Sequence, residues 1–144
     1  MMEKYYNKLT LKMESLPQNE SLARTVVAAF IAPLDPNVDT LMDVKTAVSE
    51  AVTNAVIHGY RGKSGEIELD MTLEDNVLSI IVADRGVGIA DIAQAMEPLY
   101  TTMSPDMERA GMGFTVMESF MDEVKVVSRP GQGTTIKMVR NLSK

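Results

Sequence analysis

The chain has 144 residues, of which 45% are hydrophobic and 24% charged, so we expect one soluble globular domain over residues 1–144. It has no cysteine and one histidine, which excludes disulfides, thiolate chemistry and multi-histidine metal sites. The net charge of −6 argues against direct nucleic-acid binding. No apolar run reaches the ~20 residues of a membrane span and no secretory signal opens the chain, so no membrane association and a cytoplasmic location are expected.

The first half of the chain predicts one strand and two helices. Leu9, Leu11 and Met13 alternate with polar residues, which is typical of a half-buried strand. A helix is predicted over 18–35, with Pro33 near its end. A second helix is predicted from about Pro36 to Gly59, because its apolar residues recur at helical spacing.

The second half switches to the two-residue period of strands. Strands are predicted over 66–73 and 77–84 as a hairpin, followed by a glycine-bearing loop and a short helix. Residues 96–110 lack a clean period and predict a long loop. A third long helix is predicted over 111–122, and two closing strands over 123–128 and 134–141. The fold class is therefore α+β, a two-layer α/β sandwich with helices on one face of a mixed, mainly antiparallel sheet.

Three polar residues form one row on the second predicted helix. Glu50, Asn54 and His58 recur every fourth residue, beside the apolar stripe. An Asn oxygen can ligate Mg²⁺, and a carboxylate one turn away can accept a proton from a hydroxyl. A polar helix flank stabilised by neighbouring pairs is the alternative, and His58 alone suits the last carbonyls of a helix.

Two short glycine motifs follow strands. In "ADRGVGI", Asp84 ends a strand and could accept a hydrogen bond from the exocyclic amine of a base, while Gly86 and Gly88 permit a sharp turn and a flat ring. In "GQGTTI", Thr134 could offer its hydroxyl toward the same base. Taken singly, each motif is better explained as an ordinary turn.

A third glycine motif, "RAGMGF", covers residues 109–114. Gly111 and Gly113 precede or open the third helix, where free backbone N–H groups bind phosphate. Arg109 could neutralise charge on a transferred phosphoryl group. The alternative is a flexible entry to a helix with a solvated arginine.

The four motifs in this order resemble the nucleotide-binding motifs of the superfamily that joins DNA gyrase, the Hsp90 chaperones, histidine kinases and the MutL repair proteins. The resemblance implies a Bergerat-type ATP-binding fold with ATP/ADP and Mg²⁺ as ligands. Within it, "VSEAVTNAVIHGY" and "EPLYTTMSPDMERAGMGF" resemble the stand-alone serine kinases that act as sporulation anti-sigma factors.

The resemblance assigns a role to each matching residue. It implies that Glu50 is the general base, that Asn54 ligates Mg²⁺, and that residues 96–110 form a lid over ATP. It further implies adenine contacts and phosphate contacts from these residues: Asp84, Gly86, Gly88 and Thr134 at the base; Thr101, Thr102, Arg109, Gly111, Met112 and Gly113 at the phosphates. Met103 departs from the basic residue expected after the two threonines.

The resemblance also implies partners. Such proteins are homodimers that hold a sigma factor of the sporulation sigma F type inactive, and they phosphorylate a serine of an anti-anti-sigma antagonist. The first helix, including Arg24, is the expected sigma-docking surface. Two other functions stay open: a nucleotide-dependent sigma-binding module without phosphoryl transfer, and an ATPase that phosphorylates histidine.

Overall fold

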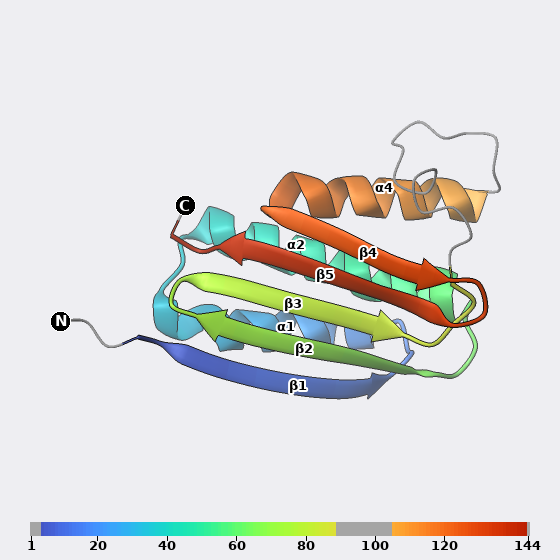
Figure 1. Cartoon of the computed structure of the whole chain (residues 1–144), viewed down its shortest axis with the longest axis horizontal. Helices are drawn as coiled ribbons and strands as arrows, with labels where there is room; N and C mark the ends of the chain where they lie inside the picture. Colours follow the sequence, from blue (N-terminus) through green and yellow to red (C-terminus); the bar gives the residue numbers. More distant parts are fainter. Residues whose placement is uncertain (1–3, 89–104, 144) are drawn as a thin grey trace.

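The computed structural model describes residues 4–88 and 105–143, and these form one helical layer on one sheet (Figure 1). None of the helices in this described part is both long and apolar enough to cross a bilayer. The elements in chain order are β1 (Tyr6–Glu14), α1 (Asn19–Ile31), the 3₁₀ helix η1 (Ala32–Leu34), α2 (Val38–Thr53), the π-helix η2 (Asn54–Gly59), β2 (Glu66–Glu74), β3 (Val77–Asp84), α4 (Pro105–Phe120), β4 (Glu123–Arg129) and β5 (Gly133–Asn141).

The sheet confirms the predicted two-layer sandwich. Its strand order is β1-β2-β3-β5-β4, and α1, α2 and α4 lie on one face (Figure 1). Every described pair of neighbouring strands is antiparallel, so the sheet is less mixed than the sequence analysis predicts. The alternating side chains of β2 point into the core with no exposed surface: Ile67, Leu69, Met71 and Leu73.

Local sequence explains where the first two helices end and begin. Pro33 lies in η1, which continues directly from α1. Asp35 follows in the left-handed conformation (φ 49°). The side chain of Asn37 then accepts a hydrogen bond from the Thr40 N–H at 2.8 Å, which satisfies a free donor at the start of α2.

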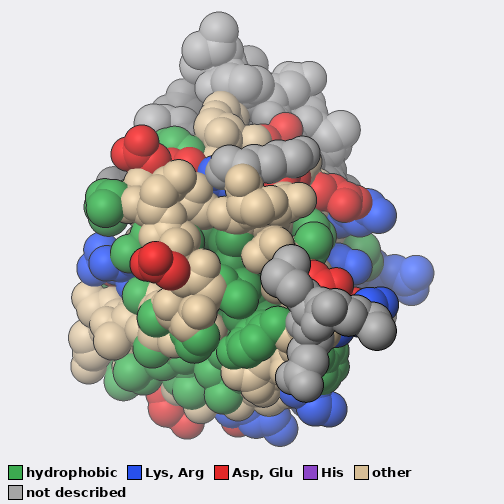
Figure 2. Space-filling model, turned by 90° about the vertical axis from the view of Figure 1, so that its left-hand side faces the viewer, with side chains coloured by type: hydrophobic (Ala, Val, Ile, Leu, Met, Phe, Trp, Pro, Cys, Tyr) green, Lys and Arg blue, Asp and Glu red, His purple; other side chains and the backbone are tan. Residues whose placement is uncertain are grey.

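Among the residues whose side chains the structure describes, the methionines mostly fill the core. Met13, Met71, Met117, Met121 and Met138 are all buried. Met42, in the second turn of α2, is 51% exposed. Figure 2 shows the end of the molecule where α2 begins, and hydrophobic side chains gather there among scattered charges.

The third long helix begins earlier than predicted. α4 starts at Pro105, so the loop prediction is wrong for residues 105–110, and the predicted helix start at Gly111 is wrong as well. Proline is well suited to a first helical turn, because its missing N–H would have no partner there. The remainder of the predicted lid and the predicted short helix before it lie outside the described residues.

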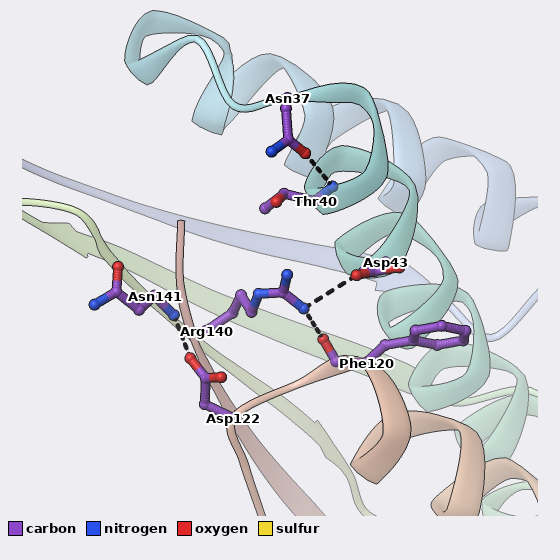
Figure 3. A network of polar contacts seen from close by, with 7 residues as sticks. All are labelled: Asn37, Thr40, Asp43, Phe120, Asp122, Arg140 and Asn141. Atoms are coloured by element: carbon purple, nitrogen blue, oxygen red, sulfur yellow. Dashed lines mark hydrogen bonds and ion pairs between the residues drawn. The ribbon is translucent and has the colours of Figure 1, made fainter. Parts of the chain in front are cut away.

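Arg140 on β5 ties the far end of α4 to α2 (Figure 3). Its Nη1 lies 3.2 Å from Oδ2 of Asp43 and also donates to the carbonyl of Phe120, the last residue of α4. Close by, Asp122 Oδ2 accepts from the Asn141 N–H at 2.6 Å. A guanidinium at a helix carboxyl end satisfies a free carbonyl and opposes the helix dipole, so this network anchors α4.

Candidate functional site

The predicted polar row spans a change of helix type. Glu50 lies in the last turn of α2, whereas Asn54 opens the π-helix η2, in which the Tyr60 N–H bonds the Ala55 carbonyl five residues back at 2.9 Å. The wider turn interrupts the regular four-residue ladder between Asn54 and His58. Single π turns inside α-helices recur at functional sites, because they change the direction of the side chains that follow.

Glu50 lies where three helices meet. A Cβ built on Gly113 of α4 would be 3.1 Å from its Oε2 atom. From α1, Glu20 accepts a hydrogen bond from the hydroxyl of the neighbouring Ser49 and pairs with Arg24 at 3.2 Å. Burial raises the pKa of Glu50, and the charge of Glu20 raises it further. A carboxyl group with a raised pKa is well suited to proton transfer near neutral pH.

Asn54 presents an unsatisfied acceptor. The residue is 5% exposed, and its Oδ1 has no hydrogen-bond partner among the residues that the structure describes. Buried polar atoms are rarely left without a partner. An amide oxygen is a hard ligand of the kind that Mg²⁺ prefers, so Asn54 fits the predicted metal role.

Asp84 is held in a close-fitting turn at the end of β3. It is 6% exposed, and its Oδ1 accepts from the Gly86 N–H at 2.9 Å. Burial raises its pKa, while hydrogen bonds from the backbone of Gly86 and Thr134 act in the opposite direction. A Cβ on Gly59 would lie 2.8 Å from the Asp84 carboxyl, so only glycine leaves that carboxyl its place.

The turn that follows Asp84 packs on the turn between β4 and β5 and on the residues that flank it. The Val87 carbonyl accepts from the Gly131 N–H at 2.7 Å, and Gly88 has a positive φ of 75°. Side chains at Gly88 or Gly133 would overlap the facing backbone. The structure therefore brings together Asp84, Gly86 and Gly88 with the strand that carries Thr134.

Thr134 has a defined hydrogen-bond role. It pairs with Asp84 across the β3–β5 ladder, is 3% exposed, and its Oγ1 lies 2.7 Å from Ser128 Oγ. Because the Ser128 hydroxyl donates to the Gly133 carbonyl at 3.0 Å, Thr134 must donate to Ser128 if both contacts are made. The Thr134 oxygen then keeps lone pairs to accept from a ligand or water.

The glycines predicted to bind phosphate do not lie at the start of a helix. Gly111, Met112 and Gly113 lie inside α4, where backbone N–H groups are engaged by the helix, so the predicted cradle at a helix start is not formed in this structure. Thr101, Thr102 and Met103 lie outside the described residues. The backbone of Arg109 lies in α4, and its side chain is outside the described part of the structure.

Sequence reasoning missed several residues of the site. It treats Gly59 as a simple helix stop and assigns nothing to Tyr60, Glu20 or Ser49. Gly59 could have been suspected from its place directly after the polar row. The contacts of the other three residues join segments far apart in the chain, and no local pattern indicates such pairings.

Comparison with known proteins agrees with this arrangement. A model of the histidine kinase-like ATPase domain matches residues 13–140. A protein named anti-sigma F factor from Bacillus subtilis is 52% identical over 139 residues, covering 96% of this chain and 94% of the relative. Its namesake in Clostridium acetobutylicum is 54% identical over 137 residues, covering 95% of each chain.

Two solved structures resemble the fold. The RsbU and RsbW domains of a Mycobacterium tuberculosis protein give a TM-score of 0.68 at 22% identity, covering 94% of this chain and 32% of that one. A blue-light activated histidine kinase from Erythrobacter litoralis gives 0.56 at 25% identity, covering 76% of this chain and 32% of that chain.

Proposed function

The chain belongs to the histidine kinase-like ATPase domain family, among relatives named anti-sigma F factor, and we propose that it is an anti-sigma factor with protein serine kinase activity. In this proposal it binds and inhibits a sporulation sigma factor in the cytoplasm. It also uses ATP to phosphorylate, and so inactivate, an anti-anti-sigma protein. We further propose that it acts as a homodimer.

Adenine recognition is assigned to the end of β3. The Asp84 carboxylate accepts a hydrogen bond from the 6-amino group, and Thr134 offers a second acceptor beside it. The absence of side chains at Gly86 and Gly88 lets this turn pack closely on the backbone of Gly59 and Arg129. The proposal is supported by the burial of Asp84 and by the glycines that surround it, because a side chain at Gly59 would displace the carboxyl group.

The phosphates and Mg²⁺ are assigned to residues of η2 and α4. The metal, held by Asn54, would offset the negative charge that gathers on the phosphates during transfer. The backbone at Gly111–Gly113, with Thr101, Thr102 and Arg109, would contact the phosphates. This requires residues 105–110 to leave the helix when ATP binds. Two glycines in a helix interior reduce its stability by about 1 kcal/mol each, which favours such a change.

Phosphoryl transfer is assigned to Glu50. The serine oxygen of the antagonist forms a bond to the γ-phosphorus, the bond from that phosphorus to the β–γ bridging oxygen breaks, and ADP leaves. Glu50 takes the proton of the serine hydroxyl. Burial and the charge of Glu20 raise the pKa of Glu50, which increases its affinity for that proton.

The observation that carries the proposal is the position of Glu50 against Gly113, one turn before the unsatisfied oxygen of Asn54. The test uses labelled ATP, Mg²⁺ and the candidate antagonist. Glu50→Gln should bind nucleotide but transfer no phosphate, whereas the control Glu123→Gln, an exposed carboxylate on β4, should behave as the parent protein.

The outcomes separate the possible functions. Normal labelling by Glu50→Gln would remove Glu50 from its role. Sigma binding without any ADP production in the presence of the antagonist would instead support a binding module. Acid-labile label on the antagonist would point to a histidine acceptor rather than serine.

The sigma-docking surface is assigned to α1. Leu22 is 44% exposed on this helix, and Arg24 keeps its side chain 40% exposed while pairing with Glu20. An exposed apolar side chain and a partly exposed charged one on the same helix suit a protein partner. Arg24→Ala should weaken capture of the sigma factor in a pull-down and leave nucleotide affinity unchanged. Unaltered capture would move the docking surface elsewhere.

A further inference from the structure

The backbone of the turn after Asp84 is bonded at three consecutive amides. The Arg85 N–H donates to the Tyr60 hydroxyl at 2.8 Å, the Gly86 N–H to Asp84 Oδ1 at 2.9 Å, and the Val87 N–H to the Gly59 carbonyl at 2.9 Å. Two of these acceptors belong to Gly59 and Tyr60, at the exit of the π-helix. Of the two, the Gly59 acceptor is a backbone carbonyl and the Tyr60 acceptor is a side-chain hydroxyl, so only Tyr60 can be altered by substitution of a side chain.

The Tyr60 hydroxyl is itself held in place. It donates to the Glu66 carbonyl at the start of β2 at 2.5 Å, so the one oxygen both accepts and donates. The ring lies against Gly65, where any Cβ would overlap the ring carbons. Tyr60 therefore joins three segments: the π-helix exit, the first residue of β2 and the turn that carries Asp84.

We propose that Tyr60 is a positioning residue that sets the Asp84 carboxylate for recognition of the 6-amino group of a purine nucleotide. The inference rests on the proposed nucleotide-binding function and adds a residue to it. The hydroxyl fixes the amide directly after Asp84, and Gly59 closes the other side of the same carboxyl group. A shift of the turn would turn the carboxylate away from the amino group of the base.

We expect the fold to tolerate the loss of this hydroxyl. Arg85 is exposed, so water can replace the phenol as partner of its N–H, and the ring packing survives in phenylalanine. Tyr60→Phe should therefore keep the structure while loosening the turn. The loss should appear only for ligands that carry the amino group.

The test is a calorimetric titration with Mg²⁺ and two ligands: ADP, and purine riboside 5′-diphosphate, which is ADP without the amino group. In Tyr60→Phe we expect ADP affinity to fall about tenfold and affinity for the analogue to change less than about twofold. Tyr6→Phe, on a side chain that is 61% exposed, serves as the control. Gly65→Ala, which displaces the ring but keeps the hydroxyl, should reproduce the selective loss.

Amide hydrogen exchange gives an independent measurement. Exchange at Arg85 should quicken in Tyr60→Phe while the midpoint of global unfolding stays close to that of the parent. An equal loss for both ligands, or unchanged ADP affinity, would overturn the positioning role while nucleotide binding by the parent stands. Failure of the parent protein to bind either ligand would instead refute the proposed function, and this inference with it.

Discussion

Glu50 of α2 and Gly113 of α4 are in such close contact that a Cβ on Gly113 would lie 3.1 Å from the carboxylate oxygen Oε2. The contact joins two motifs separated by more than sixty residues of sequence. It makes the position of the candidate base depend on the small size of one residue in the facing helix.

Gly113→Ala should therefore displace Glu50 slightly and lower the rate of phosphoryl transfer by up to about tenfold, because misplaced catalytic groups lose rate steeply. Nucleotide affinity should change less than the rate. Single-turnover transfer measured beside ADP titration separates the two effects. Ser119→Ala, at an exposed position on the same helix, is the matched control, and equal rates in both variants would contradict the role of the contact.

Glu20→Gln should shift the pH profile of phosphoryl transfer. Burial is the main cause of the raised pKa of Glu50 and the charge of Glu20 is the second, so removing that charge lowers this pKa but leaves it above 4.5. The base must be ionised to accept a proton, so the rate rises with pH through that pKa. We expect the acid limb of the profile to move to lower pH in the variant; an unmoved limb would show that Glu20 does not act on the base.

ADP binding should weaken on acidification through protonation of Asp84. Burial raises its pKa above 3.8, and only the carboxylate form accepts a hydrogen bond with a full charge. Affinity should therefore rise with pH through the raised pKa and then level off. The ratio of affinities of the parent and Asp84→Asn, titrated across this range, isolates the effect from titration of the ligand. A constant ratio would exclude Asp84 as the titrating group.

Arg140→Met should destabilise the protein without affecting nucleotide binding. The change keeps most of the apolar stem but leaves the Phe120 carbonyl and Asp43 without their guanidinium partner, at a cost of about 1–3 kcal/mol. Denaturant unfolding measures this. Lys125→Met removes an exposed partner of Glu123 and should cost less than about 1 kcal/mol. Similar losses in both variants would mean that the partly buried network contributes no more than a surface pair.

Much of the fold follows from local pattern. The alternation of β2 and the apolar stripe of α2 each identify an element, because the periods of a strand and a helix differ. The order of the glycine motifs and the polar row predicts the nucleotide-binding family, to which the comparisons assign the chain. Glu50, Asn54 and Asp84 could be selected because their residue types and spacing carry the chemistry.

Tertiary structure decided how those motifs meet. The helix start at Pro105 was missed, because the apolar residues of 96–110 have no period and two glycines suggest a later start. The π-helix at Asn54–Gly59 was missed too, since α and π turns share the same residue types.

The sequence by itself determined most of the elements, the family and the candidate groups. Only the folded chain decided that Gly59 makes room for Asp84, that Tyr60 holds the turn after it, and that Glu20 raises the pKa of Glu50. The physical reason is that periodicity and turn chemistry act over a few residues, whereas close packing, burial and charge interactions depend on which distant segments share a volume.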